Sequence, residues 1–247
     1  NITVEENNDT AFPVTATDAL GKEITLEEAP DRIVSLTPSN TEILFGLGLD
    51  EEVVGVNDND NYPQQVADKT RIGGTEYNIE TIISLQPDVV FAHESSMFTF
   101  ESAIEQLEAS GVTVFVVDNA ETFDETYETI EVIGTLTGKD EEADKIIASI
   151  QSKLADIQAK LQGVSPKTAF MVVGASPDIY VVGQNTFMNE MLKEINVDNV
   201  VKEEGWPLYS AEQFIAANPD SIVFTYEGHD EMIKNNLIDL YNNIELP

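Results

Sequence analysis

Cysteine is absent from the 247 residues, which excludes disulfides, thiolate nucleophiles, cysteine-ligated zinc and iron–sulfur clusters. Positive charge is scarce: 12 Lys and Arg stand against 46 Asp and Glu, a formal net charge of −34. Such a chain repels phosphate, so we expect no nucleic-acid partner. No apolar run approaches the roughly 20 residues of a membrane span. The hydrophobic content of 42% still supports real cores, so the chain is not a disordered acidic tail.

Apolar strand patterns alternate with helical patterns along the first half of the chain. Residues 1–13 form a polar lead-in, and residues 14–26 read as a hairpin with its turn at 19–22. We expect strands at 32–36, 52–56, 88–92 and 112–117, and helices at 38–49, 78–85, 99–109 and 122–136. Ser39 or Asn40 is the expected N-cap of the first helix, with Glu42 in its first turn. This alternation predicts an α/β lobe over 14–138 with a largely parallel sheet.

Residues 139–162 carry an apolar stripe at helical spacing, which predicts one long helix. The α/β pattern then restarts and predicts a second lobe over 163–247. Its expected strands lie at 168–174, 178–182 and 221–226, and its expected helices at 185–195, 211–217 and 230–244.

An internal repeat relates the two lobes. Residues 80–88 (ETIISLQPD) match residues 212–220 (EQFIAANPD), with the same spacing from Glu to Pro, and an apolar strand follows each. The helix at 139–162 then connects the lobes. By this comparison the second lobe lacks a strand and a helix, so we expect a truncated C-terminal lobe.

Loops at the carboxyl ends of parallel strands are the default place for a binding cleft. Those loops hold most of the tyrosines, both histidines and the only tryptophan, which suits a bulky apolar ligand. The candidate cleft residues are Tyr62, Tyr77, His93, Tyr180, Trp206, Tyr209, Tyr226 and His229. Plain loop packing is the alternative role for each of them.

Glu80 and Glu212 occupy the same place in the two repeats, near the first turn of a short helix. Glutamate there complements the helix dipole. A functional alternative is a symmetric pair of acidic knobs that dock on basic sockets of a two-fold partner.

Catalytic motifs are missing from the sequence. No G-x-S-x-G elbow, Walker loop, G-x-G-x-x-G or H-E-x-x-H occurs, and two histidines are too few for a convincing zinc or manganese site. An enzyme remains the alternative from a different class, with Ser39 and His93 as its candidate residues. A sensory or adhesive domain is a third alternative.

Four stretches resemble the substrate-binding proteins of ABC importers for iron complexes and cobalamin. They are RIVSLTPSNTEILFGLGL (32–49), VVGVNDNDNYP (53–63), IGGTEYNIETIISLQPDVVFAH (72–93) and GWPLYSAEQFIAANPDSIV (205–223). The resemblance is strongest to the vitamin B12-binding members, particularly Gram-positive lipoproteins, and it covers residues 14–226. It implies two Rossmann-like lobes bridged by a single long helix, the class III periplasmic-binding fold. It also implies capture of a ligand in the cleft and delivery to a membrane permease, without chemistry.

By the same resemblance, Glu80 and Glu212 match the family's lobe glutamates, which pair with permease arginines. Trp206 and Tyr62 match cleft aromatics of the B12 binders, and Tyr180 lies near another. Gly74 stands where the proteobacterial B12 binder has a second tryptophan, which leaves the choice of ligand open.

The expected function is therefore that of an extracytoplasmic solute-binding protein for cobalamin or a related corrinoid, a monomer with no cofactor and no resident metal. Heme and ferric siderophores are the alternative ligands; heme-binding relatives use a histidine of the second lobe, for which His229 is the candidate. Scarce arginine argues against a strongly anionic catecholate siderophore. The start at Asn1 suits a cell-surface lipoprotein of a Gram-positive bacterium whose lipidated cysteine lies upstream; the periplasm is the other expected location.

Overall fold

The computed structural model describes residues 12–175 and 179–225. The chain forms two compact units: unit 1 comprises residues 1–120 and 124–151, and unit 2 comprises residues 121–123 and 152–247. The last residue of the predicted strand at 221–226, Tyr226, lies outside the described residues, as do the predicted helix at 230–244 and His229. Within the described residues, no helix combines the length and the apolar character needed to cross a membrane.

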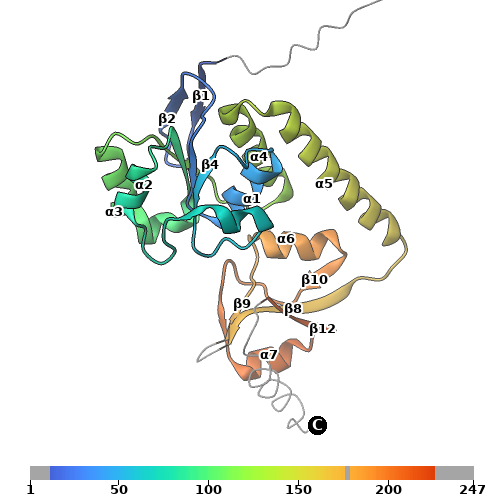
Figure 1. Ribbon diagram of the computed structural model, residues 1–247. Helices are drawn as coiled ribbons and strands as arrows, with labels where there is room; N and C mark the ends of the chain where they lie inside the picture. The colour runs from blue at the N-terminus through green and yellow to red at the C-terminus, as the bar shows by residue number, and fades with distance from the viewer. Residues whose placement is uncertain (1–11, 176–178, 226–247) are drawn as a thin grey trace, which may run out of the picture. The chain divides into compact units, whose positions relative to one another are not determined.

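Unit 1 is built on a five-stranded parallel sheet, ordered β5-β4-β3-β6-β7 (Figure 1). Its strands are β3 (Ile33–Ser35), β4 (Val53–Val56), β5 (Thr70–Arg71), β6 (Val89–His93) and β7 (Val114–Val117). Its helices are α1 (Pro38–Gly46), α2 (Ile79–Ser84), α3 (Met97–Ala109), α4 (Phe123–Thr137) and part of α5 (Asp140–Lys160), with 3-10 turns η1 (Gln64–Asp68) and η2 (Glu94–Ser96). The antiparallel hairpin β1 (Val14–Thr17) and β2 (Glu23–Leu26) has the predicted limits.

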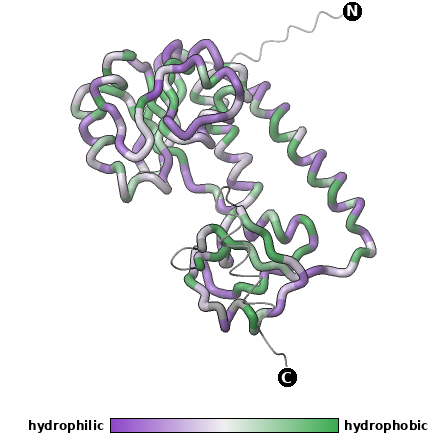
Figure 2. The backbone as a smooth tube through the Cα atoms, turned by 60° about the horizontal axis from the view of Figure 1, so that its bottom comes forward, coloured by the Kyte–Doolittle hydropathy of each residue, from purple (hydrophilic) through white to green (hydrophobic). Residues whose placement is uncertain are grey.

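Both faces of this sheet are buried, as expected for parallel strands. Alternate residues of one strand enter different cores: Val89 and Phe91 pack with α1, α4 and α5, whereas Val90 and Ala92 pack with α2 and α3. Hydrophobic and hydrophilic stretches alternate along α5 (Figure 2). Ala143 and Ile147 are the buried residues of α5, which confirms its apolar stripe.

Unit 2 has a five-stranded mixed sheet. Its strands are β8 (Lys167–Ala175), β9 (Ile179–Val181), β10 (Val197–Asn199), β11 (Leu208–Tyr209) and β12 (Ser221–Phe224), and its helices include α6 (Phe187–Glu194) and α7 (Ala211–Ala217). Strand β8 pairs in parallel with β10 and β12 and antiparallel with β9, which pairs antiparallel with β11. The boundary between the units falls inside α5, after Gln151. The lobe limits 14–138 and 163–247 and the connecting role of 139–162 stay predictions.

The internal repeat is confirmed by backbone geometry. Helices α2 and α7 each end next to a residue in the left-handed region, Gln86 at φ 48° and Asn218 at φ 42°. Each is followed by Pro-Asp and then by a strand that pairs in parallel with the first strand of its unit, β6 with β3 and β12 with β8.

The aspartates of the repeat make equivalent hydrogen bonds in both units. Asp88 Oδ2 accepts the backbone N–H of Arg32 at 2.8 Å, and Asp220 Oδ2 accepts the backbone N–H of Thr168 at 2.8 Å. Each bond ties the start of one parallel strand to the start of its neighbour. A carboxylate that accepts backbone N–H groups makes a strong, charge-assisted bond, so this pair fixes strand register in both sheets.

The start of α1 differs from the prediction. Neither Ser39 nor Asn40 is the N-cap: Thr37 occupies that position without a side-chain capping bond, and Glu42 lies beyond the first turn. The Asn40 amide instead donates to the carbonyl of Ala92 at 2.9 Å. The polar side chain that was expected to cap the helix therefore holds the helix to the end of strand β6.

Three short strands, β5, β10 and β11, were not predicted. Two or three residues are too few to show a period of two, and these strands exist because neighbouring strands offer them backbone partners.

The excess of carboxylates makes stability sensitive to ionic strength. Ion pairs such as Lys145–Glu141 at 3.7 Å and Lys167–Asp220 at 3.8 Å are solvent-exposed and offset little of the net charge of −34. Raising NaCl from about 0.01 M to about 0.1 M shortens the Debye length from about 30 Å to about 10 Å. We expect the melting temperature at pH 7, measured by circular dichroism, to rise by several degrees over this range.

The control is the same salt series near the sequence pI of about 4.1, where the net charge is close to zero. The salt response should nearly vanish there. An equal rise at both pH values would show that repulsion between carboxylates is not the cause.

Candidate functional site

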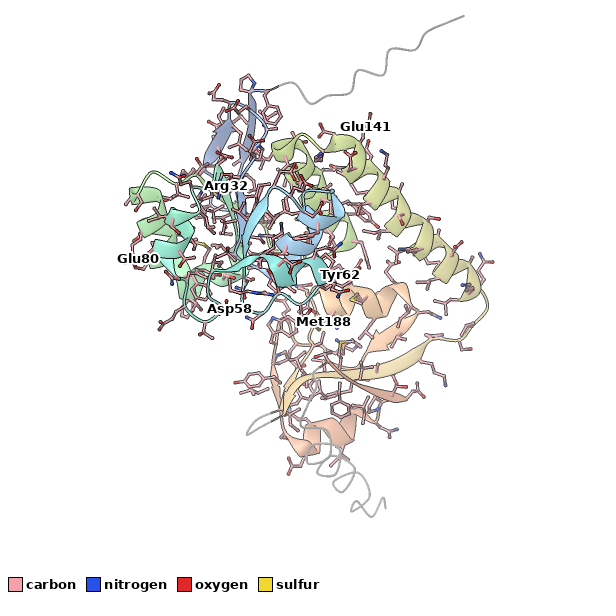
Figure 3. All side chains as sticks on the ribbon, viewed as in Figure 1. Arg32, Asp58, Tyr62, Glu80, Glu141 and Met188 are labelled. Carbon is pink, nitrogen blue, oxygen red and sulfur yellow. The ribbon has the colours of Figure 1, made fainter. Side chains whose placement is uncertain are left out.

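Unit 1 presents its loops at the carboxyl ends of β3, β4, β6 and β7. The loop after β4, residues 57–63, carries Tyr62, whose side chain is 65% exposed (Figure 3). This exposure leaves the ring accessible, and the role of Tyr62 as a cleft aromatic stays a prediction.

Buried polar groups hold this loop in place. Asp60 is 3% exposed, and its Oδ2 accepts the Thr41 hydroxyl at 2.7 Å and the Asn57 N–H at 3.0 Å. The Arg71 guanidinium donates to the carbonyls of Asn57 at 2.8 Å, Asp60 at 2.9 Å and Val66 at 3.2 Å. The loop backbone is therefore fixed from two sides, by the first helix and by strand β5.

Burial raises the pKa of Asp60, while the bonds from Thr41 and Asn57 and the charge of Arg71 act in the opposite direction. The second carboxylate oxygen, Oδ1, is buried without a hydrogen-bond partner. Arg71 faces backbone carbonyls here, and the other arginine, Arg32, donates its Nε to the carbonyl of Leu85 at 2.7 Å. Both arginines of the chain thus bind backbone carbonyls.

Tyr77 is half-buried and acts mainly as a structural contact. Its hydroxyl donates to the carbonyl of Leu36 at 3.1 Å, and its ring lies 4.2 Å from that of Phe100, centroid to centroid. Burial raises the pKa of Tyr77 to about 12. The structure favours the packing alternative for this residue.

His93 ends strand β6 and is half-buried. Its Nδ1 accepts the Ser95 N–H at 3.2 Å and lies 2.8 Å from the Ser95 hydroxyl. Burial lowers the pKa of His93, so the ring is neutral at pH 7. Ser95 thus occupies Nδ1 of the ring. Ser39, the candidate nucleophile, has the Thr37 hydroxyl as its neighbour at 3.5 Å, so no Ser–His hydrogen bond forms.

Unit 2 exposes a group of apolar side chains around β11. Trp206 is 51% exposed, Leu208 is 52% and Tyr180 is 44%. Leu208 and Tyr180 are directly opposite each other in the β9–β11 pair, and Trp206 lies two residues before Leu208. Leu208 was not among the predicted residues; nothing in the sequence marks its exposure, because an isolated leucine before a tyrosine reads as core.

The loop that carries Trp206 is tied to the segment before α6 by three backbone bonds. Gly183 N–H donates to Gly205 O at 2.8 Å, Gly205 N–H to Gln184 O at 2.8 Å, and Gln184 N–H to Glu203 O at 2.7 Å. A Cβ on Gly183 would lie 2.3 Å from Glu203 O and 2.8 Å from Gly205 O. Only glycine permits this approach.

Tyr209 closes the same loop. Its hydroxyl donates to the Glu203 carboxylate at 2.7 Å, and its ring lies edge-on to Phe170 at 5.4 Å. Burial, with the bond to Glu203 as a second cause, raises the pKa of Tyr209 to about 12, and the same bond lowers the pKa of Glu203. Tyr209 therefore braces the Trp206 loop more than it presents a free face.

Glu80 and Glu212 lie at the second residue of α2 and of α7, and both are exposed (Figure 3 labels Glu80). Hydrogen bonds from its own backbone N–H and from Ser210 lower the pKa of Glu212. The predicted equivalence of the two positions is confirmed, whereas their docking role stays a prediction.

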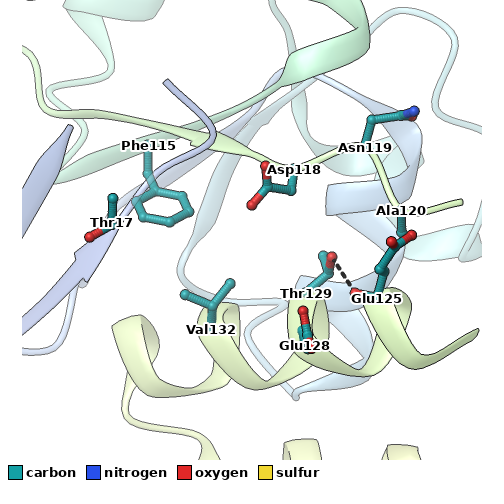
Figure 4. A pocket seen from close by; sticks show the side chains of 9 residues that line it. All are labelled: Thr17, Phe115, Asp118, Asn119, Ala120, Glu125, Glu128, Thr129 and Val132. Atoms are coloured by element: carbon teal, nitrogen blue, oxygen red, sulfur yellow. Dashed lines mark hydrogen bonds between the residues drawn. The ribbon is translucent and has the colours of Figure 1, made fainter. Parts of the chain in front are cut away.

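A cavity of about 350 Å³ in unit 1 lies elsewhere, between β1, β7 and α4 (Figure 4). It is lined by Thr17, Phe115, Asp118, Asn119, Ala120, Glu125, Glu128, Thr129 and Val132. None of the predicted cleft residues among those that the structure describes lines it. In the part of the chain that the structure describes, no group of three or more His, Asp or Glu is placed to hold a metal ion.

Phe98 is a further exposed aromatic that sequence analysis missed. It lies in the first turn of α3, just beyond the carboxyl end of β6, and is fully exposed at 101%. The available signal was its place directly after the loop that holds His93, but its neighbours Met97 and Phe100 suggested an ordinary buried helix face.

The fold and these loops define a two-unit α/β binding protein without a catalytic constellation among its described residues. The chain matches the periplasmic binding protein family over residues 33–242 and belongs to that family. An uncharacterized ABC transporter substrate-binding lipoprotein of Bacillus subtilis (strain 168), YvrC, is 45% identical over 218 residues, which are 87% of this chain and 69% of the relative.

Two further proteins are similar. A cobalamin-binding protein of Halobacterium salinarum (strain ATCC 29341 / DSM 671 / R1) is 28% identical over 223 residues; the match covers 86% of this chain and 58% of that protein, less than two thirds of its length. The solved structure of a possible iron-binding (periplasmic solute-binding) protein from Staphylococcus epidermidis ATCC 12228 superposes with a TM-score of 0.77 at 33% identity, over 88% of this chain and 84% of that one. The predicted family and fold class are confirmed.

The close approach at Gly183 yields a prediction. Gly183→Ala should lower the free energy of unfolding by roughly 1–3 kcal/mol, because backbone atoms must move to admit the methyl group. The same movement should shift the emission maximum of Trp206, the only tryptophan. Chemical denaturation and tryptophan emission spectra measure the two effects.

Gly174→Ala is the matched control in the same unit. Its added Cβ would meet only Tyr180 side-chain atoms at 3.8 Å and 3.9 Å, an ordinary contact. Equal effects of the two substitutions would refute the role assigned to Gly183.

Proposed function

We propose that the chain is the extracytoplasmic solute-binding component of an ABC importer and that its ligand is cobalamin or a related corrinoid. The observation that carries the choice of ligand is the exposure of the aromatic loops, with Tyr62 in unit 1 and Tyr180 and Trp206 in unit 2. A corrinoid offers a large, partly apolar ring system to such side chains. Capture in a cleft between the lobes remains the prediction made from the sequence.

The relatives support this proposal at two levels. The 45% identical Bacillus subtilis protein is named a substrate-binding lipoprotein of an ABC transporter, which supports the transport role, an extracytoplasmic location and a lipid anchor. The Halobacterium salinarum relative is named a cobalamin-binding protein, which supports the ligand.

The use of the arginines also favours an uncharged ligand. Arg71 and Arg32 both donate to backbone carbonyls, so neither is committed to a ligand carboxylate or catecholate. A ferric catecholate is therefore a poor candidate, whereas a hydroxamate complex carries less charge.

Heme is the second candidate ligand. The similarity to a possible iron-binding protein of Staphylococcus epidermidis favours iron-containing ligands in general. His229 lies outside the described residues and stays the heme candidate.

Titration of the purified protein with cyanocobalamin tests the ligand. We expect saturable quenching of Trp206, matched by heat in calorimetry, and weaker binding of heme and of a ferric hydroxamate. Trp206→Ala should weaken cobalamin affinity about tenfold or more, since a large aromatic contact contributes roughly 2 kcal/mol. Free N-acetyltryptophanamide corrects for light absorbed by the ligands.

Leu20→Ala is the control variant, because Leu20 is 56% exposed in the turn of the β1–β2 hairpin and belongs to none of the aromatic loops. It should bind like the unaltered protein. Saturation by heme or siderophore with no heat from cobalamin would reassign the ligand.

We also propose that Glu80 and Glu212 dock the protein on its permease, one from each unit. Both are exposed, so Glu80→Ala combined with Glu212→Ala should abolish ligand uptake in cells and leave ligand affinity unchanged. Uptake of radiolabelled cobalamin and calorimetry measure these two quantities.

The control replaces two acids in the first turn of α5, Glu141→Ala with Glu142→Ala, and removes the same charge. Normal uptake by the Glu80 and Glu212 double variant would exclude the docking role.

A further inference from the structure

Each unit contains a buried asparagine at the end of a strand that follows a strand and a helix along the chain. The strand pairing differs between the units, because β4 pairs with β3, whereas β10 pairs with β8 and not with β9. In unit 1, β3, α1 and β4 follow one another, and Asn57 is the next residue. In unit 2, β9, α6 and β10 follow one another, and Asn199 is the last residue of β10. Both side chains are 4% exposed, so their polar atoms need internal partners.

The two asparagines make the same pair of bonds. Asn57 Nδ2 donates to the carbonyl of Leu36 at 2.8 Å, and its Oδ1 accepts the N–H of Asn59, two residues ahead, at 2.9 Å. Leu36 directly follows β3, the strand that leads into α1. One amide thus ties the ends of two strands together and turns the chain.

Asn199 reproduces this pattern. Its Nδ2 donates to the carbonyl of Val182 at 2.8 Å, and its Oδ1 accepts the N–H of Val201, two residues ahead, at 3.0 Å. Val182 directly follows β9, the strand that leads into α6. A weaker contact to Asn189 Oδ1 at 3.2 Å supports the amide from a second side.

Each asparagine opens the loop that carries an exposed aromatic. Tyr62 follows Asn57 by five residues, and Trp206 follows Asn199 by seven. We propose that Asn57 and Asn199 are paired positioning residues, which set the direction of the two ligand-contacting loops through one shared hydrogen-bond pattern.

The chemistry requires asparagine at both places. One donor and one acceptor are needed at the end of a short side chain. Aspartate keeps the acceptor but loses the donor and adds a buried charge beside a carbonyl oxygen. Serine is too short to reach both partners at once.

The single tryptophan reports on the second loop without any ligand. In Asn199→Asp, the steady-state anisotropy of Trp206 should fall and its quenching by acrylamide should rise, under conditions where the circular dichroism spectrum is unchanged. Asn199→Ser, which adds no charge, should change both signals in the same direction and serves if the aspartate variant does not fold.

Asn196→Asp is the matched control within unit 2. Asn196 Nδ2 also donates to a backbone carbonyl, that of Val164 at 2.9 Å, but it opens no aromatic loop. Its replacement should leave Trp206 anisotropy unchanged. A change equal to that of the Asn199 variants would mean general loosening and would overturn the proposal, as would an unaltered Trp206 in both Asn199 variants.

Unit 1 is tested with a moved reporter. In a chain carrying Tyr62→Trp and Trp206→Phe, Asn57→Asp should lower the anisotropy of the new tryptophan, whereas Asn199→Asp should not. Loss of anisotropy from both substitutions, or from neither, would contradict separate positioning by each asparagine.

The affinity measurement rests on the proposed function. Cyanocobalamin affinity should fall about tenfold in Asn57→Asp or Asn199→Asp and stay unchanged in Asn196→Asp. If the unaltered protein does not bind cobalamin, the proposed ligand fails, while the anisotropy results still decide the role of the asparagines.

Discussion

At the ends of the parallel strands in both units, backbone N–H and C=O groups have no neighbouring strand with which to pair. In unit 1 helices cover both faces of the sheet, so water reaches these groups poorly and side chains must satisfy them. Asn40, Asn57 and Arg71 do so by donating to carbonyls of neighbouring segments. The conformation of the loops therefore depends on buried polar side chains. These side chains also set the direction in which the exposed aromatic residues point.

The same solution occurs twice. The aspartates of the repeat join the starts of neighbouring strands, and the asparagines join the ends of β4 and β10 to the residues that follow β3 and β9. In each unit, side chains with equivalent roles thus fix the chain at the starts and at the ends of strands. This holds although the units differ in size and unit 2 adds the antiparallel pair β9–β11. Duplicated anchors explain why a sequence repeat of only nine residues corresponds to a much wider structural repeat.

Local patterns predicted most elements well, because helix and strand periods come from burial of one face or both. The apolar stripe of α5 and the repeated Glu-to-Pro-Asp segment are examples, and both are confirmed. The N-cap of α1 was predicted wrongly because the choice among Thr37, Ser39 and Asn40 depends on where β3 ends and on the distant carbonyl of Ala92. No local signal contains that information.

In the candidate site, too, local sequence patterns predicted some features and missed others. The loops and their aromatic residues were predicted from the ends of the strands, but the bracing contacts were not. Tyr77 bonds to Leu36, which is far away in the chain, and Tyr209 bonds to Glu203, which nothing in the composition of its loop marks as a partner. Gly183 was not singled out from the sequence, because its requirement for glycine arises from the backbone of residues 203–205. Contacts of this kind distinguish an aromatic residue that braces a loop from one that remains exposed.

That separation bears on the ligand. Once the braced tyrosines are set aside, Tyr62, Tyr180, Trp206 and Leu208 remain exposed on the loops, and all are apolar or aromatic. The cations that could balance an anionic ligand are few, and both arginines are held by carbonyls. Affinity must then come from apolar contact area and shape rather than from charge pairing, and such contacts select only when the side chains are held still. On the proposed function, the buried amides and carboxylates that fix the loops therefore contribute to ligand specificity.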